Sequence, residues 1–213
     1  MSSKNITTNF KYNNITISGF PGSGSTTLLN MLKKSENLKF EGWSGFSGGD
    51  FMRSYAKEKG LFVENAGVHH DSRHYEDDFD RQVDMDIREK LTNDSGWIIE
   101  SWLSGFMAQN IAGTLKILMT CSNKAVKIDR IVNRDTITPS AAIANMNDRY
   151  AQNLSKWQRM YKKEWDEWVV KTGKAKTSDP IDFWRPNLYD IVINTYSSNQ
   201  QETLKIVIDA ITK

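Results

Sequence analysis

A glycine-rich loop at residues 19–27 constrains the fold of this chain more than any other segment. It follows the β-branched run Ile15-Thr16-Ile17 and precedes an apolar helical start at Leu28. A strand, a glycine-rich loop and a helix in this order let backbone N–H groups converge on phosphate oxygens, with the positive end of the helix dipole behind them. The sequence therefore predicts a phosphate-binding loop. Its members are Gly19, Phe20, Pro21, Gly22, Ser23, Gly24, Ser25, Thr26 and Thr27.

The serine at position 25 departs from the P-loop pattern G-x-x-x-x-G-K-[ST], in which a lysine occupies this place. The residues alone leave three alternatives open: a tight strand-to-helix turn that binds nothing, a nucleotide binder without activity, and a loop family that binds phosphate without the lysine. The strand-like run before the loop and the two threonines, Thr26 and Thr27, at its end favour phosphate binding.

Length, charge and cysteine content narrow the class of protein. The 213 residues suit one α/β domain with insertions. A formal net charge of +2 is too small to indicate a nucleic-acid surface. No apolar run is long enough for a signal peptide or a membrane span, and the single cysteine, Cys121, is typical of a reducing compartment. We expect a cytoplasmic protein with no nucleic-acid or membrane partner.

Strand-like and helix-like segments alternate along the chain. Because this alternation is typical of a parallel sheet with helices on both faces, the fold class is expected to be α/β, a three-layer fold of the P-loop NTPase type with a five-stranded parallel sheet. The expected strands lie near residues 14–18, 38–42, 96–100, 115–119 and 190–194.

Several segments between the expected strands are predicted to be helices. Residues 44–50 are expected to form a flexible loop, with Asp50 as the N-cap of a helix at 51–59. Apolar residues recur every four positions over 77–91, which predicts an amphipathic helix. The region 141–170 has no helix breaker, and its aromatic stripe is expected to pack inside the protein rather than to stack on bases. The stripe consists of Trp157, Tyr161, Trp165 and Trp168.

Two segments have no clear secondary-structure signal. Residues 172–187 contain Lys, Ser and Pro and are interpreted as a loop. Residues 61–75 hold all three histidines, His69, His70 and His74. A histidine pair on one helix face can bind zinc, but no thiolate or convincing third ligand is nearby. A solvated loop is the favoured interpretation and a metal site is the alternative.

Charged residues follow two of the predicted elements. Glu100 ends a strand, and ligands of doubly wound sheets bind beyond the carboxyl ends of strands. Glu100 is therefore expected to face the phosphates. Arg130 and Arg134 lie four apart on one helix face. A solvated basic face is the alternative, but a helix that directly follows a sheet strand in a chain with a phosphate loop favours a ligand-binding role.

These motifs together resemble the nucleoside monophosphate kinases, most closely the archaeal-type cytidylate kinases and their relatives. The resemblance extends from Ile15 to Ile211, apart from residues 172–187. The segment GDFMR at 49–53 is similar to the substrate motif of the family, and RIVNR at 130–134 is similar to its lid hinge. The family commonly has threonine in place of the P-loop lysine, and Ser25 is the nearest chemical equivalent.

One segment departs from the family pattern. The sequence ESWLSG at 100–105 resembles a family segment that reads Glu-Gly-Arg-Leu-Ser/Ala-Gly, so Trp102 stands where the family has an arginine. Tryptophan cannot make the bidentate contacts with phosphate that arginine makes. The identity of the acceptor is therefore open at this position. Trp102 either stacks on a flat substrate or fills an apolar gap.

The resemblance implies a single P-loop kinase domain over 1–213 that transfers a phosphoryl group from ATP to a nucleoside monophosphate, with CMP or dCMP favoured. ATP would bind the loop 19–27 with Mg²⁺ on the Thr26 hydroxyl. The implied catalytic residues are Arg130, Arg134, Arg149 and Glu100, with Lys156 as a further cation. The implied acceptor-binding residues are Asp50, Arg53, Asp84, Trp102 and Gly105. The implied core is 13–49, 94–134 and 187–213, with an acceptor-binding insertion at 50–93 and a lid and helical insertion at 135–186.

Two alternatives to this function stay open. The first is a kinase of the same fold that acts on a different small molecule, for which Trp102 is the reason. The second is a non-catalytic nucleotide-binding module, which the Arg130 and Arg134 pair disfavours. A monomer and a homodimer are both compatible with the sequence.

Overall fold

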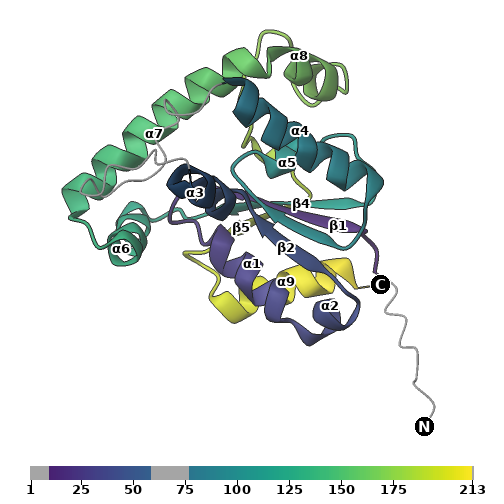
Figure 1. Ribbon diagram of the computed structural model, residues 1–213, viewed down its shortest axis with the longest axis horizontal. Helices are drawn as coiled ribbons and strands as arrows, with labels where there is room; N and C mark the ends of the chain where they lie inside the picture. The colour runs from purple at the N-terminus through teal and green to yellow at the C-terminus, as the bar shows by residue number, and fades with distance from the viewer. Residues whose placement is uncertain (1–9, 59–76, 213) are drawn as a thin grey trace.

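The computed structural model of the chain describes residues 10–58 and 77–212 (Figure 1). Its centre is a five-stranded sheet in the order β2-β3-β1-β4-β5. All four strand pairs are parallel, which confirms the predicted fold class. The strands are β1 (Asn14–Gly19), β2 (Ser44–Ser47), β3 (Trp97–Glu100), β4 (Thr114–Thr120) and β5 (Ile191–Asn194).

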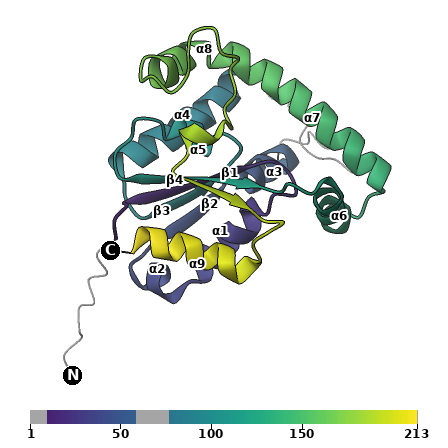
Figure 2. The same ribbon diagram turned by 180° about the vertical axis from the view of Figure 1, so that it is seen from behind.

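Helices cover both faces of the sheet and make the fold three-layered (Figures 1 and 2). One face carries α1 (Ser25–Lys34), α2 (Glu36–Phe40) and α9 (Gln200–Ile211). The other face carries α4 (Asp77–Asn93), α5 (Ser104–Met107) and α8 (Lys162–Trp165). At the carboxyl end of the sheet lie α3 (Gly48–Glu58) and α6 (Lys124–Asp135), and α7 (Pro139–Met160) runs from α6 to α8 as a long bar. A π-helix (Asp166–Val170) and a 3₁₀ helix (Pro186–Leu188) complete the elements.

Two hydrophobic cores hold these layers together, one on each face of the sheet. The core under α1 and α9 contains Ile15, Ile17 and Leu32, all fully buried. The core under α4, α5 and α8 contains Phe106 and Trp165. β1 lies between the two cores and all six of its residues are buried. The central strand is therefore rigidly held, and the loop that follows it is positioned by both cores.

The second strand was predicted at the wrong place. Residues 36–40 form α2, in which Leu38 is fully buried, and the strand is β2 at Ser44–Ser47. The interpretation of 44–50 as a flexible loop is therefore also wrong. β2 is rich in serine and glycine and gains its conformation from pairing with β3, where Ser47 lies opposite Glu100. Strand conformation at such a position is set by tertiary pairing and not by local propensity.

The start of α3 also differs from the prediction. The helix begins at Gly48, so Asp50 lies inside its first turn and is not the N-cap. The Ser47 hydroxyl accepts a hydrogen bond from the Asp50 backbone N–H at 3.2 Å and takes the capping role. The predicted histidine loop at 61–75 lies outside the described residues. None of the helices described by the structure is long and apolar enough to cross a membrane.

The long helical region after Pro139 is divided. α7 ends at Met160, because Tyr161 leaves helical geometry with φ −109°. The prediction that the aromatic stripe packs inside the protein is confirmed, since Tyr161 and Trp165 are buried in the core around Phe106. Residues 172–187 are also part of this core, because they contribute the buried side chains Phe183 and Trp184.

Candidate functional site

The glycine-rich loop turns sharply between β1 and α1. Gly22 has φ +80° and Gly24 has φ +90°, a region that favours glycine. The Ser23 N–H donates to the Phe20 carbonyl at 3.0 Å, which closes the turn. Gly24, the N-cap of α1, has no side chain to cap the helix, so the N–H groups of its first turn face the loop. The loop therefore has the geometry of an anion-binding helix N-terminus.

Gly22 is a loop position that tolerates a side chain poorly. A Cβ atom there would lie 2.7 Å from the Lys127 carbonyl oxygen, in addition to the positive φ. We expect Gly22→Ala to lower the free energy of unfolding by about 1–3 kcal/mol and to weaken ATP binding. Urea unfolding and ATP titration measure the two effects.

The matched control is Gly42→Ala. Gly42 has φ +77°, but a Cβ atom at this position would meet none of the other described residues within 4 Å. It therefore carries the same backbone strain without the close contact. If Gly22→Ala were as stable as Gly42→Ala and bound ATP as tightly as the wild type, the loop would not pack closely against α6.

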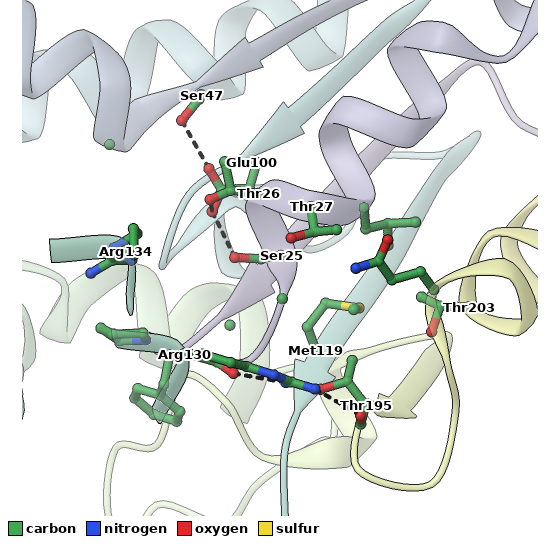
Figure 3. Close-up of a pocket in the computed structure, with 18 of the residues that line it drawn as sticks. Ser25, Thr26, Thr27, Ser47, Glu100, Met119, Arg130, Arg134, Thr195 and Thr203 are labelled. Carbon is green, nitrogen blue, oxygen red and sulfur yellow. Dashed lines mark hydrogen bonds between the residues drawn. The ribbon is translucent and has the colours of Figure 1, made fainter. Parts of the chain in front are cut away.

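The Glu100 carboxylate accepts hydrogen bonds from hydroxyl groups at the carboxyl end of the sheet (Figure 3). The Ser25 hydroxyl donates to its Oε1 at 2.8 Å and the Ser47 hydroxyl to its Oε2 at 2.9 Å. The Thr26 hydroxyl lies 3.4 Å from Oε1. Glu100 is 7% exposed. The residue at the P-loop lysine position is thus tied to the carboxylate of the neighbouring strand.

Arg130 fastens the loop to the end of β5 (Figure 3). Its guanidinium donates to the Gly22 carbonyl at 3.0 Å, to the Thr195 hydroxyl at 2.7 Å and to the Thr195 carbonyl at 3.0 Å. The Thr195 hydroxyl in turn donates to the Ser23 carbonyl at 2.9 Å. These contacts hold Arg130 at the far side of the loop from Glu100. Arg130 was predicted from sequence, whereas Thr195 was not.

Arg134 lies one turn further along α6. Its guanidinium makes two 2.7 Å hydrogen bonds with the carboxylate of Asp135. That hydrogen-bonded carboxylate raises the pKa of Arg134, so the side chain stays charged. Arg130 and Arg134 both line a large pocket above the loop. The pair therefore presents two cations to whatever occupies this pocket.

The large pocket has a volume of about 630 Å³. It is formed by the glycine-rich loop, the start of α1, the end of β3 and the start of α9. Its polar lining beyond the loop consists of Ser47, Glu100, Ser101, Arg130, Asn133, Arg134, Arg149, Thr195, Ser198, Asn199, Gln200 and Thr203.

A smaller pocket of about 130 Å³ adjoins the large one. The two share four lining residues, Gly49, Ser101, Trp102 and Arg149, so they meet at one boundary. The remaining lining residues of the small pocket come from α3, α4, α7 and residue 103. They are Gly48, Met52, Asp80, Val83, Asp84, Ile87, Leu103, Asn153 and Trp157. The arrangement is able to bring two ligands together.

The wall of the small pocket contains two partly buried carboxylates, Asp80 and Asp84, between α4 and α7. The Tyr161 hydroxyl donates to Asp84 at 2.7 Å, and Lys156 pairs with Asp80 at 2.8 Å. The pKa of Asp84 is raised from 3.8 to about 7, chiefly because desolvation disfavours the charged carboxylate. The nearby charge of Asp80 contributes to this rise, whereas Tyr161, Lys156 and Arg81 oppose it. Asp84 is therefore poised to change charge near neutral pH.

This pKa predicts a pH-dependent stability. Between pH 3.8 and about 7 the folded protein holds a proton on Asp84 that the unfolded chain releases. The contribution of Asp84 to the free energy of unfolding is therefore greatest below pH 3.8. It falls as the pH rises from 3.8 to about 7, by up to about 1.4 kcal/mol per pH unit. We expect Asp84→Asn to gain stability over the wild type as the pH rises from 5 to 8, in urea unfolding measured at both values.

Asp86→Asn, which removes an exposed carboxylate from the same helix, is the control for the Asp84 comparison. A difference between Asp84→Asn and the wild type that does not change with pH would show that Asp84 is ionised throughout this range.

Some of the remaining predicted residues line the two pockets and others do not. Glu100, Trp102 and Arg149 lie at or beside the boundary of the pockets, and Asp84 lies in the small one. Gly105 is not among the described lining residues, because it packs against the ring of Tyr189. Its position is fixed by close packing, since a Cβ there would meet that ring.

Three further predicted residues lie away from the pocket linings or outside the description. Asp50 lies in the first turn of α3 and is not among the described lining residues of either pocket. Lys156 turns toward α4, where it pairs with Asp80 and Asp77. The side chain of Arg53 is not part of what the structure describes.

Comparisons with known proteins find similar sequences over most of the chain. A family model described as an AAA domain matches residues 15–154. The cytidylate kinase of Methanosarcina acetivorans is 27% identical over 201 residues, which covers 92% of this chain and 97% of that protein. The cytidylate kinase of Methanopyrus kandleri is 28% identical over 206 residues and is covered to 92%, as is this chain.

Two solved structures share the fold. An uncharacterized protein from Eubacterium ventriosum has a TM-score of 0.56 at 15% identity, with 92% of this chain and 96% of that chain covered. A gluconokinase from Sinorhizobium meliloti has a TM-score of 0.51 at 11% identity, with 94% and 91% covered. At these identities the likeness extends to the fold alone.

Proposed function

Since the chain belongs to the AAA domain family whose model matches residues 15–154, we propose that it transfers the γ-phosphoryl group of ATP to a nucleoside monophosphate, with CMP or dCMP as the acceptor. The matches to archaeal cytidylate kinases confirm the family resemblance predicted from the sequence. They support an enzyme of the nucleoside monophosphate kinase type. The choice of CMP or dCMP is the finer part of the proposal.

The observation that carries the proposal is the junction of the two pockets. A kinase needs a donor site and an acceptor site that open onto one another, so that the reacting oxygen and phosphorus are in line. The large pocket holds the glycine-rich loop, and the small pocket meets it at Ser101, Trp102 and Arg149. ATP in the large pocket and the monophosphate in the small one place the reaction at this boundary.

The donor set at the boundary fits Mg²⁺. Mg²⁺ prefers hard oxygen ligands and is commonly held by one or two protein groups together with substrate phosphates. The Thr26 hydroxyl and the Glu100 carboxylate offer such oxygens beside the loop. The described residues contain no cluster of three or more His, Cys, Asp or Glu side chains that could hold a metal ion. When bound, the metal would neutralise charge on the transferring phosphate.

The protein's own contribution is alignment and positive charge. An oxygen of the acceptor monophosphate attacks the γ-phosphorus, the bond from that phosphorus to the β-bridging oxygen breaks, and ADP leaves. The acceptor is already an anion at neutral pH, so no general base is required. Arg134 and Arg149 would stabilise the charge on the transferring group, and Arg130 would hold the loop against Thr195. Arg53 stays the proposed anchor for the acceptor phosphate.

A second candidate is a kinase that acts on a different small molecule. The observation that favours it is the small pocket itself, which contains Asp80 and Asp84 beside Trp102. Carboxylates repel a phosphate, and they accept hydrogen bonds from hydroxyl or amino groups of an acceptor. An acceptor with hydroxyl or amino groups would therefore suit this pocket, whereas the phosphate of a nucleoside monophosphate would have to bind on the side of the pocket where Arg149 lies.

The test is ADP release from Mg-ATP across a panel of nucleoside monophosphates, with the rate in the absence of acceptor subtracted. Release that depends on CMP or dCMP is the expected result. Silence with every monophosphate, together with measurable ATP binding, would contradict the proposal. If a sugar or another small alcohol then stimulates ADP release, the second candidate is correct. If ATP binds but no tested acceptor stimulates ADP release, the protein is a non-catalytic nucleotide-binding module.

A further inference from the structure

Trp102 and Arg149 form a pair at the boundary of the two pockets. The Arg149 guanidinium lies over the Trp102 ring, 5.5 Å from its centroid. Both residues line both pockets. A cation over an indole face is attracted by the quadrupole of the ring, so the ring favours one place for the charge. The pair therefore occupies the place where the proposed donor and acceptor phosphates would meet.

The Trp102 ring is held by aromatic side chains from three separate segments. Phe20 of the glycine-rich loop lies 5.8 Å away, Trp157 of α7 lies 5.5 Å away, and Trp184 lies 6.1 Å away, all between ring centroids. The Trp184 indole N–H also donates to the Trp102 carbonyl at 2.9 Å. Edge-to-face packing on several sides leaves the ring little freedom to rotate.

Several hydrogen bonds and ion pairs join the end of α7 to α4. Those contacts start from Lys156, Arg159 and Tyr161 in the last turns of the helix and just beyond it. Arg149 lies seven positions before Lys156 on the helix, a rise of about 10 Å at 1.5 Å per residue. The side chain of Arg149 is long and rotamer-rich, and the Trp102 ring face beneath its guanidinium restricts the positions that the charge can take.

We propose, on the basis of the function proposed above, that Trp102 is a positioning residue. Its ring holds the Arg149 guanidinium at the junction of the pockets, and Phe20 and Trp184 hold the ring. On this account the tryptophan that stands in place of the family arginine does not bind phosphate itself. It places an arginine from another helix where the phosphoryl group passes.

A double-mutant cycle between the two residues tests this role through kcat and the acceptor KM. Trp102→Leu removes the ring face but keeps apolar bulk, and is expected to lower kcat about 10- to 100-fold with little change in ATP affinity. Trp102→Phe keeps a ring and is expected to lose less. In an Arg149→Ala background, Trp102→Leu is expected to change kcat by less than about twofold, because the group it positions is already absent.

Two outcomes of the cycle would overturn the proposal. The first is a Trp102→Leu effect on kcat that is as large in the Arg149→Ala background as in the wild type. The second is a rise in acceptor KM with kcat unchanged, which would mean that Trp102 stacks on the acceptor. Trp97→Leu is the matched control, because Trp97 forms another cation–π pair with Lys90 at 4.2 Å and is not among the described lining residues of either pocket. It is expected to leave kcat unchanged.

A measurement that needs no turnover separates this proposal from the proposed function. The Arg149 side-chain N–H resonance, assigned by its loss in Arg149→Lys, should carry a ring-current shift from Trp102 that disappears in Trp102→Leu. An Arg149 resonance that does not move would overturn the pairing even in an active enzyme. A wild type that is inactive with every monophosphate would instead overturn the proposed function, and the resonance would still test the contact.

Discussion

Replacement of Arg149 by alanine is expected to lower kcat about 10³-fold, as removal of an arginine from a phosphoryl-transfer site does. Arg149 lines both pockets, so its charge lies where the transferring group is proposed to pass. ATP affinity is expected to change much less, because the donor phosphates are bound mainly by backbone N–H groups of the loop. Steady-state kinetics with CMP and an ATP titration separate the two effects.

Arg159→Ala is the control on the same helix. Arg159 is exposed, pairs with Asp77 at 2.7 Å and is absent from the described lining of both pockets. It is expected to leave kcat within the scatter of the wild type. If Arg149→Ala and Arg159→Ala reduced kcat to the same small extent, Arg149 would have no role in the transfer step.

The second large effect is expected for Glu100→Gln. The substitution keeps the shape of the side chain but removes the charge that three hydroxyl groups face, from Ser25, Thr26 and Ser47. We expect kcat to fall about 10²- to 10³-fold, as for loss of a preorganised polar group in a catalytic site. We also expect a higher Mg²⁺ concentration at half-maximal activity. A Mg²⁺ titration of the initial rate measures both quantities.

Glu164→Gln controls for the loss of a buried carboxylate. Glu164 is 6% exposed, pairs with Arg81 and does not occur in the lining described for either pocket. The variant is expected to unfold at lower temperature, because the buried negative charge that pairs with the partly exposed Arg81 is removed, while kcat stays near that of the wild type. An unchanged Mg²⁺ dependence in Glu100→Gln would place the metal away from this carboxylate.

Local patterns predicted the elements that the sheet buries on both faces. Ile15, Ile17 and Ile98 lie in short β-branched runs, and such runs are typical of central parallel strands. The loop after β1 was also predictable from a local pattern, because its glycines occur where the chain turns sharply from strand to helix. β2 gave no such signal, because Ser44–Ser47 lies at the edge and becomes a strand through its pairing with β3.

The pockets depend on contacts that no local pattern encodes. Trp184 reaches Trp102 across 82 positions, and Tyr161 reaches Asp84 across 77. The charged residues of α4 are typical of an exposed helix face in the sequence, yet Asp84 is partly buried and accepts a hydrogen bond from Tyr161. Burial of a charged side chain follows from which helix packs on it, and that choice is tertiary. The glycine-rich loop was therefore predictable from local pattern. The small pocket was not, although the family resemblance pointed to Asp84 and Trp102 among its lining residues.

The serine at the P-loop lysine position has a clearer role in the structure than in the sequence. Its hydroxyl donates to Glu100 at 2.8 Å and the residue is 8% exposed, so it links α1 to β3 at the wall of the large pocket. The positive charge at the proposed reaction site comes instead from α6 and α7, through Arg134 and Arg149. The site is therefore built from elements on two sides of the pocket boundary.

The most direct test of the proposed function is the fate of the γ-phosphate. ATP radiolabelled at the γ-position is incubated with the enzyme, Mg²⁺ and CMP, and the products are separated by chromatography. The label is expected to appear in CDP, in step with ADP, and Arg149→Ala is expected to slow its appearance far more than Arg159→Ala. Label that appears only as inorganic phosphate, or that stays in ATP although ATP binds, would contradict transfer between the two pockets.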